Sequence, residues 1–348
     1  MKNTIIVTGS CGLVGSEAVK FFLKKNFYVI GIDNNYRKKL FGTEGDTSRI
    51  KKKLILNKNY LHHQIDIRNS KKIFEIFMKY SKNIKVIIHS AAQPSHDWAK
   101  NNLETDFSIN AQGTVNILNS CLKYSPKAIF IQLSTNKVYG DNPNKIKLKE
   151  GPLRFMPIDL KKYKNGFDEN LSTDHCTHSF FGVSKTYADY LAQEFGKNFN
   201  LKVGIFRAGC ITGPNHSPVK LHGFLSYLVK SCVVNKKYNI IGYKGKQVRD
   251  NIHSLDLLNC IWEFIKNPKK GEVYNIGGST FSNCSILECI KYIEQTKNIK
   301  IKINYTFKER IGDHIWYISD IRKFKNDYPN WKQIYNTKKI LDELLNNY

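Results

Sequence analysis

A glycine-rich turn between an apolar run and an amphipathic segment constrains the fold of this chain most strongly. The run NTIIVTG (3–9) leads into glycines spaced as GxxGxxG, and the helical period of EAVKFFLKKN follows them. Glycines allow a tight turn and a close approach of the backbone to a pyrophosphate, which the N–H groups and the dipole of a helix N-terminus then bind. We predict a dinucleotide-binding loop. Its expected contact residues are Gly9, Gly12, Leu13, Val14 and Gly15.

A carboxylate stands at the end of the second apolar run. The run FYVIGI (27–32) is followed by Asp33 and Asn34, about twenty residues beyond the glycines, as expected for the acidic residue that binds the adenosine ribose. A carboxylate at this position accepts both ribose hydroxyls of NAD and repels the 2′-phosphate of NADP. Arg37 and the two lysines after it lie close enough to weaken this preference. Because Asp33 has the position of the ribose-binding carboxylate, we nevertheless predict NAD as the cofactor.

Strand-like and helical segments alternate through the first part of the chain. Strand-like runs recur at 61–66, 85–91, 128–134 and 202–208, with helical patterns at 70–80, 103–122 and 184–198 between them. This alternation predicts an α/β fold of the Rossmann type, with a doubly wound parallel sheet that binds ligands beyond its carboxyl strand ends. Further cofactor contacts are expected at these ends and in the segment SINAQG, namely at Asp66, Ile67, Ala91, Ala92, Gln93 and Asn110.

The pattern changes near residue 210, where Gly, Asn, His and Pro are concentrated in GCITGPNHSPVKLHG. We predict a NAD-binding domain over 1–209 and a smaller substrate-binding lobe over 210–348, with some C-terminal segments returning to the first domain. The polar segment 141–176 lacks a clear period and is expected to be a long functional loop.

Composition bounds the function classes. The chain has 348 residues, 41% of them hydrophobic, and a formal charge of +26. The lysines are dispersed and form no basic amphipathic helix or RNA-binding motif, so we expect an anionic small substrate and no nucleic-acid partner.

No apolar stretch reaches the roughly 18 residues of a membrane span, and the N-terminal run is too short for a signal peptide. Eight cysteines without a C-x-x-C pair indicate reduced thiols and no metal site. We expect a cytoplasmic protein without a membrane partner.

Eight motifs are spread over nearly the whole chain: VTGSCGLVG, HSAAQ, SINAQGTVNIL, LSTNKVYGD, GVSK, GKQVRDNIH, VYNIGG and ERIGDHIWYISDIRK. Together they resemble the extended short-chain dehydrogenase/reductase family, in its branch of NAD-dependent nucleotide-sugar epimerases and dehydratases. STNKVYGD, NGFDE (165–169) and GKQVRD make the chain most similar to the 2-epimerases of CDP-linked 3,6-dideoxyhexoses.

The resemblance implies a reaction by transient oxidation. Bound NAD takes a hydride from a sugar carbon, the keto-sugar turns over, and the hydride returns to its other face. Thr135 matches the hydroxyl that hydrogen-bonds the reacting oxygen, and Lys185 matches the cation at the nicotinamide ribose. Arg249 and Arg310 match arginines that bind the diphosphate. The other expected substrate contacts are Asn136, Asn215, His222 and Gln247, with His216 in the same loop.

One residue departs from the family pattern. The helix that carries Lys185 usually has Tyr four residues earlier as the general base, and this chain has Phe181 there. Loss of a general base typically costs about 100- to 10,000-fold in rate, so activity is not excluded. Four residues are candidates for its replacement: His178, His96, Lys137 and Tyr139.

Three functions remain open on the sequence alone. An epimerase is favoured. A 4,6-dehydratase of this family is expected to carry an acidic residue beside the Thr135 position, where this chain has Asn136, and Asp33 disfavours a reductase that exchanges NADPH. A protein that binds NAD or a nucleotide sugar without turnover would account for Phe181. The family also implies a homodimer.

Overall fold

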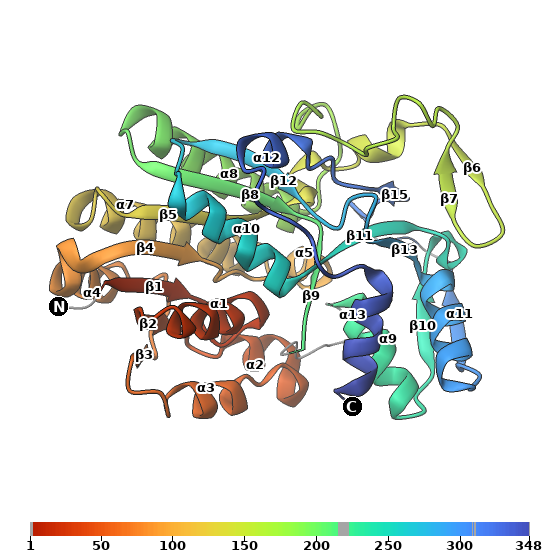
Figure 1. Ribbon diagram of the computed structural model, residues 1–348, viewed down its shortest axis with the longest axis horizontal. Coiled ribbons are helices and arrows are strands. Elements are labelled where there is room, and N and C mark those ends of the chain that lie inside the picture. The colour runs from red at the N-terminus through yellow and green to blue at the C-terminus, as the bar shows by residue number, and fades with distance from the viewer. Residues whose placement is uncertain (1–2, 215–222, 308, 310, 348) are drawn as a thin grey trace.

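The computed structural model describes residues 3–214, 223–307, 309 and 311–347. Within them, seven parallel strands form the central sheet in the order β12-β8-β5-β4-β1-β2-β3 (Figure 1). The strands are β1 (Thr4–Thr8), β2 (Tyr28–Ile32), β3 (Tyr60–His63), β4 (Ile84–His89), β5 (Ile129–Thr135), β8 (Lys202–Ala208) and β12 (Glu272–Ile276). The order reverses between β1 and β4, so the predicted Rossmann-type sheet is confirmed, with its switch point at these two strands.

Both faces of this sheet are buried, which explains its nearly continuous apolar runs. Neighbouring residues of β1 enter two separate cores, since Ile5 and Val7 pack on one side and Ile6 on the other. The first core is closed by α1 (Leu13–Lys24), α10 (Ser254–Lys266) and α12 (Arg322–Asp327). The second is closed by α4 (Ser70–Tyr80), α7 (Gly113–Tyr124) and α8 (Phe180–Asn198).

The structure departs most from the expected elements in two segments. The strand expected over 61–66 ends at His63, so Asp66 and Ile67 lie in the loop that follows it. The helix expected over 103–122 is divided into α6 (Leu103–Phe107), a π-helical turn (Ser108–Gln112) and α7. A π turn inserts one extra residue per turn, which a periodic pattern of apolar residues does not reveal.

A second lobe lies beside the carboxyl end of the sheet (Figure 1). Its core is formed by α9 (Phe224–Val233), α11 (Ile286–Lys297) and α13 (Thr337–Asn346) with the parallel pair β10 (Tyr238–Ile241) and β14 (Ile303–Thr306). A smaller sheet around β11 (Val248–His253) adjoins it, made with β9 (Cys210–Thr212), β13 (Asn283–Ser285) and β15 (Trp316–Tyr317). β12 and α10 follow residue 210 in sequence and return to the central sheet and its flank.

The remaining α-helices and strands are short. They are α2 (Tyr36–Phe41), α3 (Ser48–Leu54), α5 (His96–Lys100) and the hairpin of β6 (Leu148–Glu150) and β7 (Phe155–Pro157). This hairpin lies in the segment 141–176, which was expected to be a loop.

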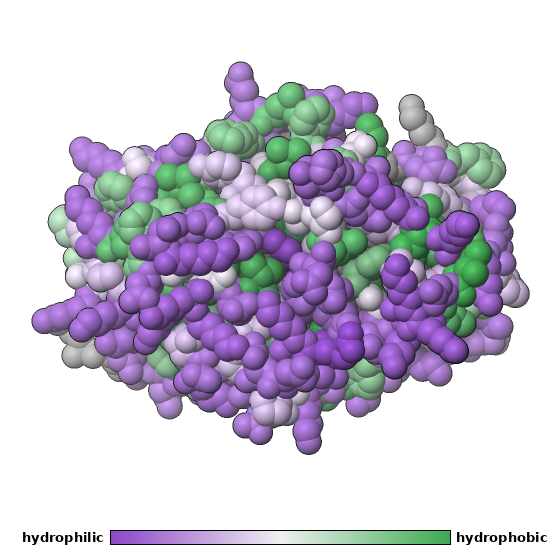
Figure 2. Space-filling model, turned by 90° about the horizontal axis from the view of Figure 1, so that it is seen from above, coloured by the Kyte–Doolittle hydropathy of each residue, from purple (hydrophilic) through white to green (hydrophobic). Residues whose placement is uncertain are grey.

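Hydrophilic side chains cover most of the face shown in Figure 2, with scattered hydrophobic patches between them. All eight cysteines are described and none forms a disulfide. None of the described helices combines the length and the apolarity that crossing a bilayer requires.

Candidate active site

A cavity of about 500 Å³ opens at the switch point and reaches from the glycine loop to the second lobe. This is where ligands bind in doubly wound sheets. It brings together most of the residues expected from the sequence to form the site. These are Gly9, Gly12, Leu13, Val14, Gly15, Asp33, Asn34, Asp66, Ile67, Ala91, Ala92, Thr135, Asn136, Phe181, Lys185, Gln247 and Arg249.

The glycine loop is packed too closely for side chains. A Cβ at Gly15 would lie 2.0 Å from the carbonyl oxygen of Gly9, and a Cβ at Gly9 would lie 2.9 Å from the Ala91 backbone. Gly9 also has a φ of +67°, which disfavours any other residue. The loop therefore holds its backbone against the sheet and leaves the N-terminus of α1 open to the cavity, which fits the pyrophosphate of a dinucleotide.

Asp33 has the position of a ribose-binding carboxylate. Its two oxygens accept hydrogen bonds from the backbone N–H groups of Cys11 (2.9 Å) and Asn35 (2.7 Å), which fix its orientation at the end of β2. Burial raises the pKa of the Asp33 carboxyl. Asn34 donates to Asp66 at 2.9 Å and so links the loops after β2 and β3 at the adenosine end.

The middle of the cavity is formed by the end of β5 and the start of α8. Thr135 ends β5 and accepts a hydrogen bond from the backbone N–H of Lys137 at 3.3 Å. The Lys185 ammonium donates to the carbonyl of Leu133 at 2.7 Å, and burial lowers its pKa to about 8. Phe181 lies one helical turn before Lys185, is 7% exposed and presents an apolar ring to the cavity.

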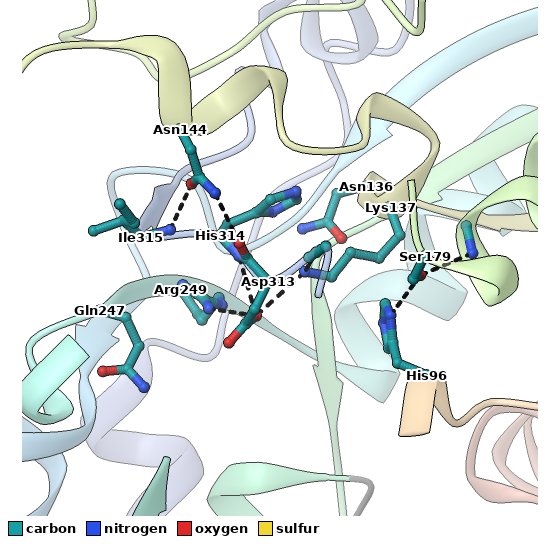
Figure 3. Close-up of polar contacts among 12 residues, drawn as sticks. His96, Asn136, Lys137, Asn144, Ser179, Gln247, Arg249, Asp313, His314 and Ile315 are labelled. Carbon is teal, nitrogen blue, oxygen red and sulfur yellow. Dashed lines mark hydrogen bonds and ion pairs between the residues drawn. The ribbon is translucent and has the colours of Figure 1, made fainter. Parts of the chain in front are cut away.

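A histidine lies against that ring. His96, the first residue of α5, lines the cavity, and its imidazole centroid is 4.7 Å from the centroid of Phe181. Its Nδ1 is 2.7 Å from the hydroxyl of Ser179, which is the N-cap of α8 and also accepts a hydrogen bond from the Gly182 N–H (Figure 3). The imidazole is therefore attached to the helix that carries Phe181 and Lys185.

Toward the second lobe, one carboxylate joins two cations. Asp313 Oδ1 accepts from Arg249 at 2.7 Å and from Lys137 at 3.4 Å (Figure 3). Burial would raise the pKa of Asp313, but Arg249 and Lys137 hold it well below its usual range. Burial lowers the pKa of Lys137 to about 8 against the opposing effect of Asp313. Asn144 bonds the Asp313 carbonyl at 2.8 Å and fixes this loop.

The wall beyond Arg249 contains an unsatisfied acceptor. Gln247 is 5% exposed, and its amide nitrogen donates to the carbonyl of Ile241 at 3.0 Å. Its amide oxygen is buried and has no partner among the described residues. Because an unpaired buried acceptor is costly, this oxygen is suited to an N–H or O–H donor of a ligand.

Several expected residues lie elsewhere. Gln93 and Asn110 are buried behind the cavity wall, where they hydrogen-bond each other and Asp106. His178 does not line the cavity; its Nε2 is 3.0 Å from the carbonyl of Thr173. Tyr139 is fully buried against Asn275 and Arg207. The expected contacts Asn215, His216, His222 and Arg310 lie outside the described residues.

Sequence reasoning also missed two residues. Asp313 stands inside the motif ERIGD but was not singled out, since an isolated aspartate gives no sign that its partners are 64 and 176 residues away. Ser179 gave a usable signal, because a serine just before a helical period is a typical N-cap. Among the described residues there is no cluster of three or more potential ligands for a metal ion.

Comparison with known proteins defines the class. Residues 5–277 match the model of the NAD dependent epimerase/dehydratase family. The CDP-paratose 2-epimerase of Salmonella typhi is 31% identical over 330 residues, which cover 92% of each chain. A dTDP-glucose 4,6-dehydratase of Salmonella typhimurium is 25% identical over 347 residues, covering 95% of this chain and 88% of the relative.

A solved structure shows the same relationship. A tyrosine-to-phenylalanine variant of the UDP-glucuronic acid 4-epimerase of Bacillus cereus, in complex with a fluorinated UDP-sugar and NAD, superposes with a TM-score of 0.77. It is 25% identical, and the match covers 99% of this chain and 98% of that one. The chain belongs to the NAD-dependent epimerase/dehydratase family, as the resemblance predicted, and NAD is its cofactor.

Proposed function

We propose that this protein is a nucleotide-sugar epimerase, and specifically a 2-epimerase that acts on a CDP-linked 3,6-dideoxyhexose of the CDP-paratose/CDP-tyvelose type. The proposal is supported by a single cavity that joins the dinucleotide loop to Arg249 and Gln247 in the second lobe. Similarity to the CDP-paratose 2-epimerase, which exceeds that to the dehydratase, supports the choice of sugar.

The positions and charge states of the carboxylates in the cavity favour an epimerase over a dehydratase. Elimination of water needs an acid that protonates the leaving hydroxyl and a base that removes a proton from carbon. Among the described residues that line the cavity, the carboxylates are Asp33, Asp66 and Asp313. The first two lie at the adenosine end, and Asp313 is held ionised by two cations. Beside Thr135 stand Asn136 and Lys137, neither of which is a carboxylic acid.

The residues of the chain divide the work of an epimerase. NAD, when bound, accepts a hydride from the sugar carbon and returns it. Thr135 holds the reacting oxygen, and Lys185 places positive charge beside it and the nicotinamide ribose. Arg249 provides a planar fork for the diphosphate, and the Gln247 amide oxygen accepts from the pyrimidine base. Rotation of the keto-sugar between the two hydride transfers then gives the epimer.

We also propose a homodimer. Phe180, Val183, Tyr187 and Tyr190 are 44–54% exposed. Their spacing places them on one side of α8. Leu103 and Phe107 of α6 add to this face, and the rings of Phe107 and Tyr187 are 6.1 Å apart. A second copy of the chain would cover this apolar face, since patches of this kind mark interaction sites.

Product analysis tests the proposal. The purified protein is incubated with CDP-paratose, CDP-tyvelose, dTDP-glucose and UDP-glucose, and the products are identified by NMR and mass spectrometry. We expect CDP-paratose and CDP-tyvelose to interconvert without change of mass. A product that has lost one water would identify a dehydratase, and no conversion of any sugar would favour a binding protein.

A further inference from the structure

The proposed function requires a group that takes the proton of the sugar hydroxyl, and position 181 cannot supply it. The inference below rests on that function and concerns only the identity of this group. Phe181 lines the cavity where the family has its phenol, so the acceptor has to reach the same part of the cavity.

The two ammonium groups near Phe181 are better donors than acceptors. Lys137 donates to the Gly312 carbonyl at 3.0 Å and to the Asp313 carboxylate at 3.4 Å. Lys185 donates to the Leu133 carbonyl at 2.7 Å. With pKa values of about 8, both are mainly protonated at neutral pH. They stabilise negative charge on the sugar oxygen, and another group has to remove its proton.

Three further groups are unsuited to accept the proton, two because of their position and one because of its pKa. Tyr139 is 0% exposed, and its hydroxyl lies between Asn275 (2.7 Å) and Arg207 (3.1 Å), outside the cavity. His178 also lies outside the cavity. Burial raises the pKa of Cys210, which does line the cavity, to about 12, so its thiol does not ionise at neutral pH.

His96 combines the required position with the required chemistry. Its ring contacts the ring of Phe181 and lines the same cavity as Thr135 and Lys185. The Ser179 hydroxyl at its Nδ1 is fixed by the Gly182 N–H at 3.1 Å. A hydroxyl oxygen can accept both hydrogen bonds, and the Nδ1–H tautomer then leaves Nε2 as the basic atom.

We propose that His96 is the general base of this protein and replaces the missing tyrosine. In the oxidation step the sugar O–H bond breaks and its proton goes to Nε2 of His96. The C–H bond at the same carbon breaks, and its electron pair leaves as hydride to the oxidised nicotinamide. The C–O single bond becomes a carbonyl. The reverse step returns hydride to the other face and the proton from the imidazolium to the oxygen, so that atoms and charge balance.

The pairing of His96 with Phe181 then has a reason. Both rings occupy the space beside the reacting oxygen, and only one of them has to carry the proton. A phenol at position 181 would duplicate the imidazole, so Phe181→Tyr in the native background is expected to change kcat by less than about tenfold, a smaller effect than that of adding a missing base.

Substitutions at His96 test the assignment. His96→Gln keeps an amide that can bond Ser179, and His96→Ala opens a space for free imidazole. We expect each substitution to lower kcat by about 100- to 10,000-fold. The rate at which reduced nicotinamide forms in a single turnover should fall by the same factor. Binding of NAD and of the CDP-sugar, measured by calorimetry, should change little. Imidazole should restore activity to His96→Ala, and Phe181→Tyr should partly restore His96→Gln. The control is His175→Ala, whose side chain is 91% exposed.

The outcomes separate the inference from the function. A His96→Gln variant with native kcat overturns the inference and leaves the epimerase proposal intact. A loss that neither imidazole nor Phe181→Tyr restores assigns His96 a structural role and also overturns it. If the native protein converts none of the nucleotide sugars, the proposed function fails and the inference fails with it.

Discussion

Arg249 and Asp313 form an ion pair of 2.7 Å in the cavity wall, although they are 64 residues apart in the chain. Arg249 lies on β11 and Asp313 on the loop before β15, and the ammonium of Lys137 reaches Asp313 from the turn after β5. One carboxylate thus holds two cations at the place where the sugar and the diphosphate are expected to meet.

Removal of this carboxylate should shift the alkaline limit of activity. In the proposed function Lys137 and Lys185, whose pKa values are about 8, act as protonated ammonium groups, so kcat/KM should fall as the pH rises through this value. Asp313 raises the pKa of Lys137, and Asp313→Asn therefore lowers it. We expect this alkaline fall in kcat/KM to move to lower pH in Asp313→Asn. It should stay in place in Asp174→Asn, whose side chain is 85% exposed. If the alkaline fall in kcat/KM is unchanged in Asp313→Asn, Lys137 is not required in its charged form.

Asp33 should decide the choice of cofactor. Asp33→Asn keeps the size of the side chain but removes the charge that, in the proposed role of Asp33, accepts the ribose hydroxyls. Hydrogen bonds to charged groups contribute about 1.5–3 kcal/mol, so NAD affinity should fall by about 10- to 100-fold. The affinity for NADP should fall less, since the substitution relieves the repulsion between the carboxylate and the 2′-phosphate of NADP. Calorimetric titration of both cofactors measures the ratio, and an unchanged preference for NAD would contradict the role of Asp33.

The buried pair of Arg207 and Asp189 should control stability. The guanidinium donates to both carboxylate oxygens, at 2.8 and 3.0 Å, and the two side chains are 5% and 0% exposed. Arg207→Met leaves the carboxylate buried without its cation, which should cost about 3–5 kcal/mol in the free energy of unfolding. Lys197→Met is the matched control. It removes a surface pair of 3.6 Å with Glu194 and should cost less than about 1 kcal/mol. Denaturant titration distinguishes the two, and equal losses would refute the assignment.

The exposed stripe on α8 should hold the dimer together. Val183→Glu places a charge in the middle of the apolar face, at a position that does not line the cavity. Burial of an unpaired charge is costly, so the dimer should dissociate while the monomer stays folded. Light scattering after gel filtration measures the mass, with Val234→Glu, 57% exposed at the end of α9, as the control. A native chain that is already monomeric would contradict the proposal.

The local parts of the fold could be predicted from the sequence. The apolar runs of β1, β2, β4, β5 and β8 are buried on both faces, so their residues signal strands without any knowledge of tertiary structure. The glycine loop and Asp33 have fixed spacing and were located for the same reason. β10 and β14 could not be paired from the sequence, because 61 residues separate them and each is only four residues long.

The catalytic centre was predicted less completely than the fold. Phe181 indicated, by comparison with the family pattern, that the usual base is missing, and His96 and His178 were equally plausible as replacements. Their difference arises from side-chain direction, since His96 begins α5 and lines the cavity, whereas His178 bonds back to its own loop at Thr173. Two histidines in loops give the same sequence signal whichever way they face.

The most direct test of the central claim follows one hydrogen atom. The protein, loaded with NAD, is supplied with CDP-paratose that carries deuterium at the carbon to be epimerised. The account predicts CDP-tyvelose with the deuterium retained at that carbon, because the hydride leaves and returns within one cavity, and NAD is oxidised again at the end of each turnover. Epimerisation with replacement of the deuterium by solvent hydrogen would show that a proton and not a hydride is moved, and would contradict the account.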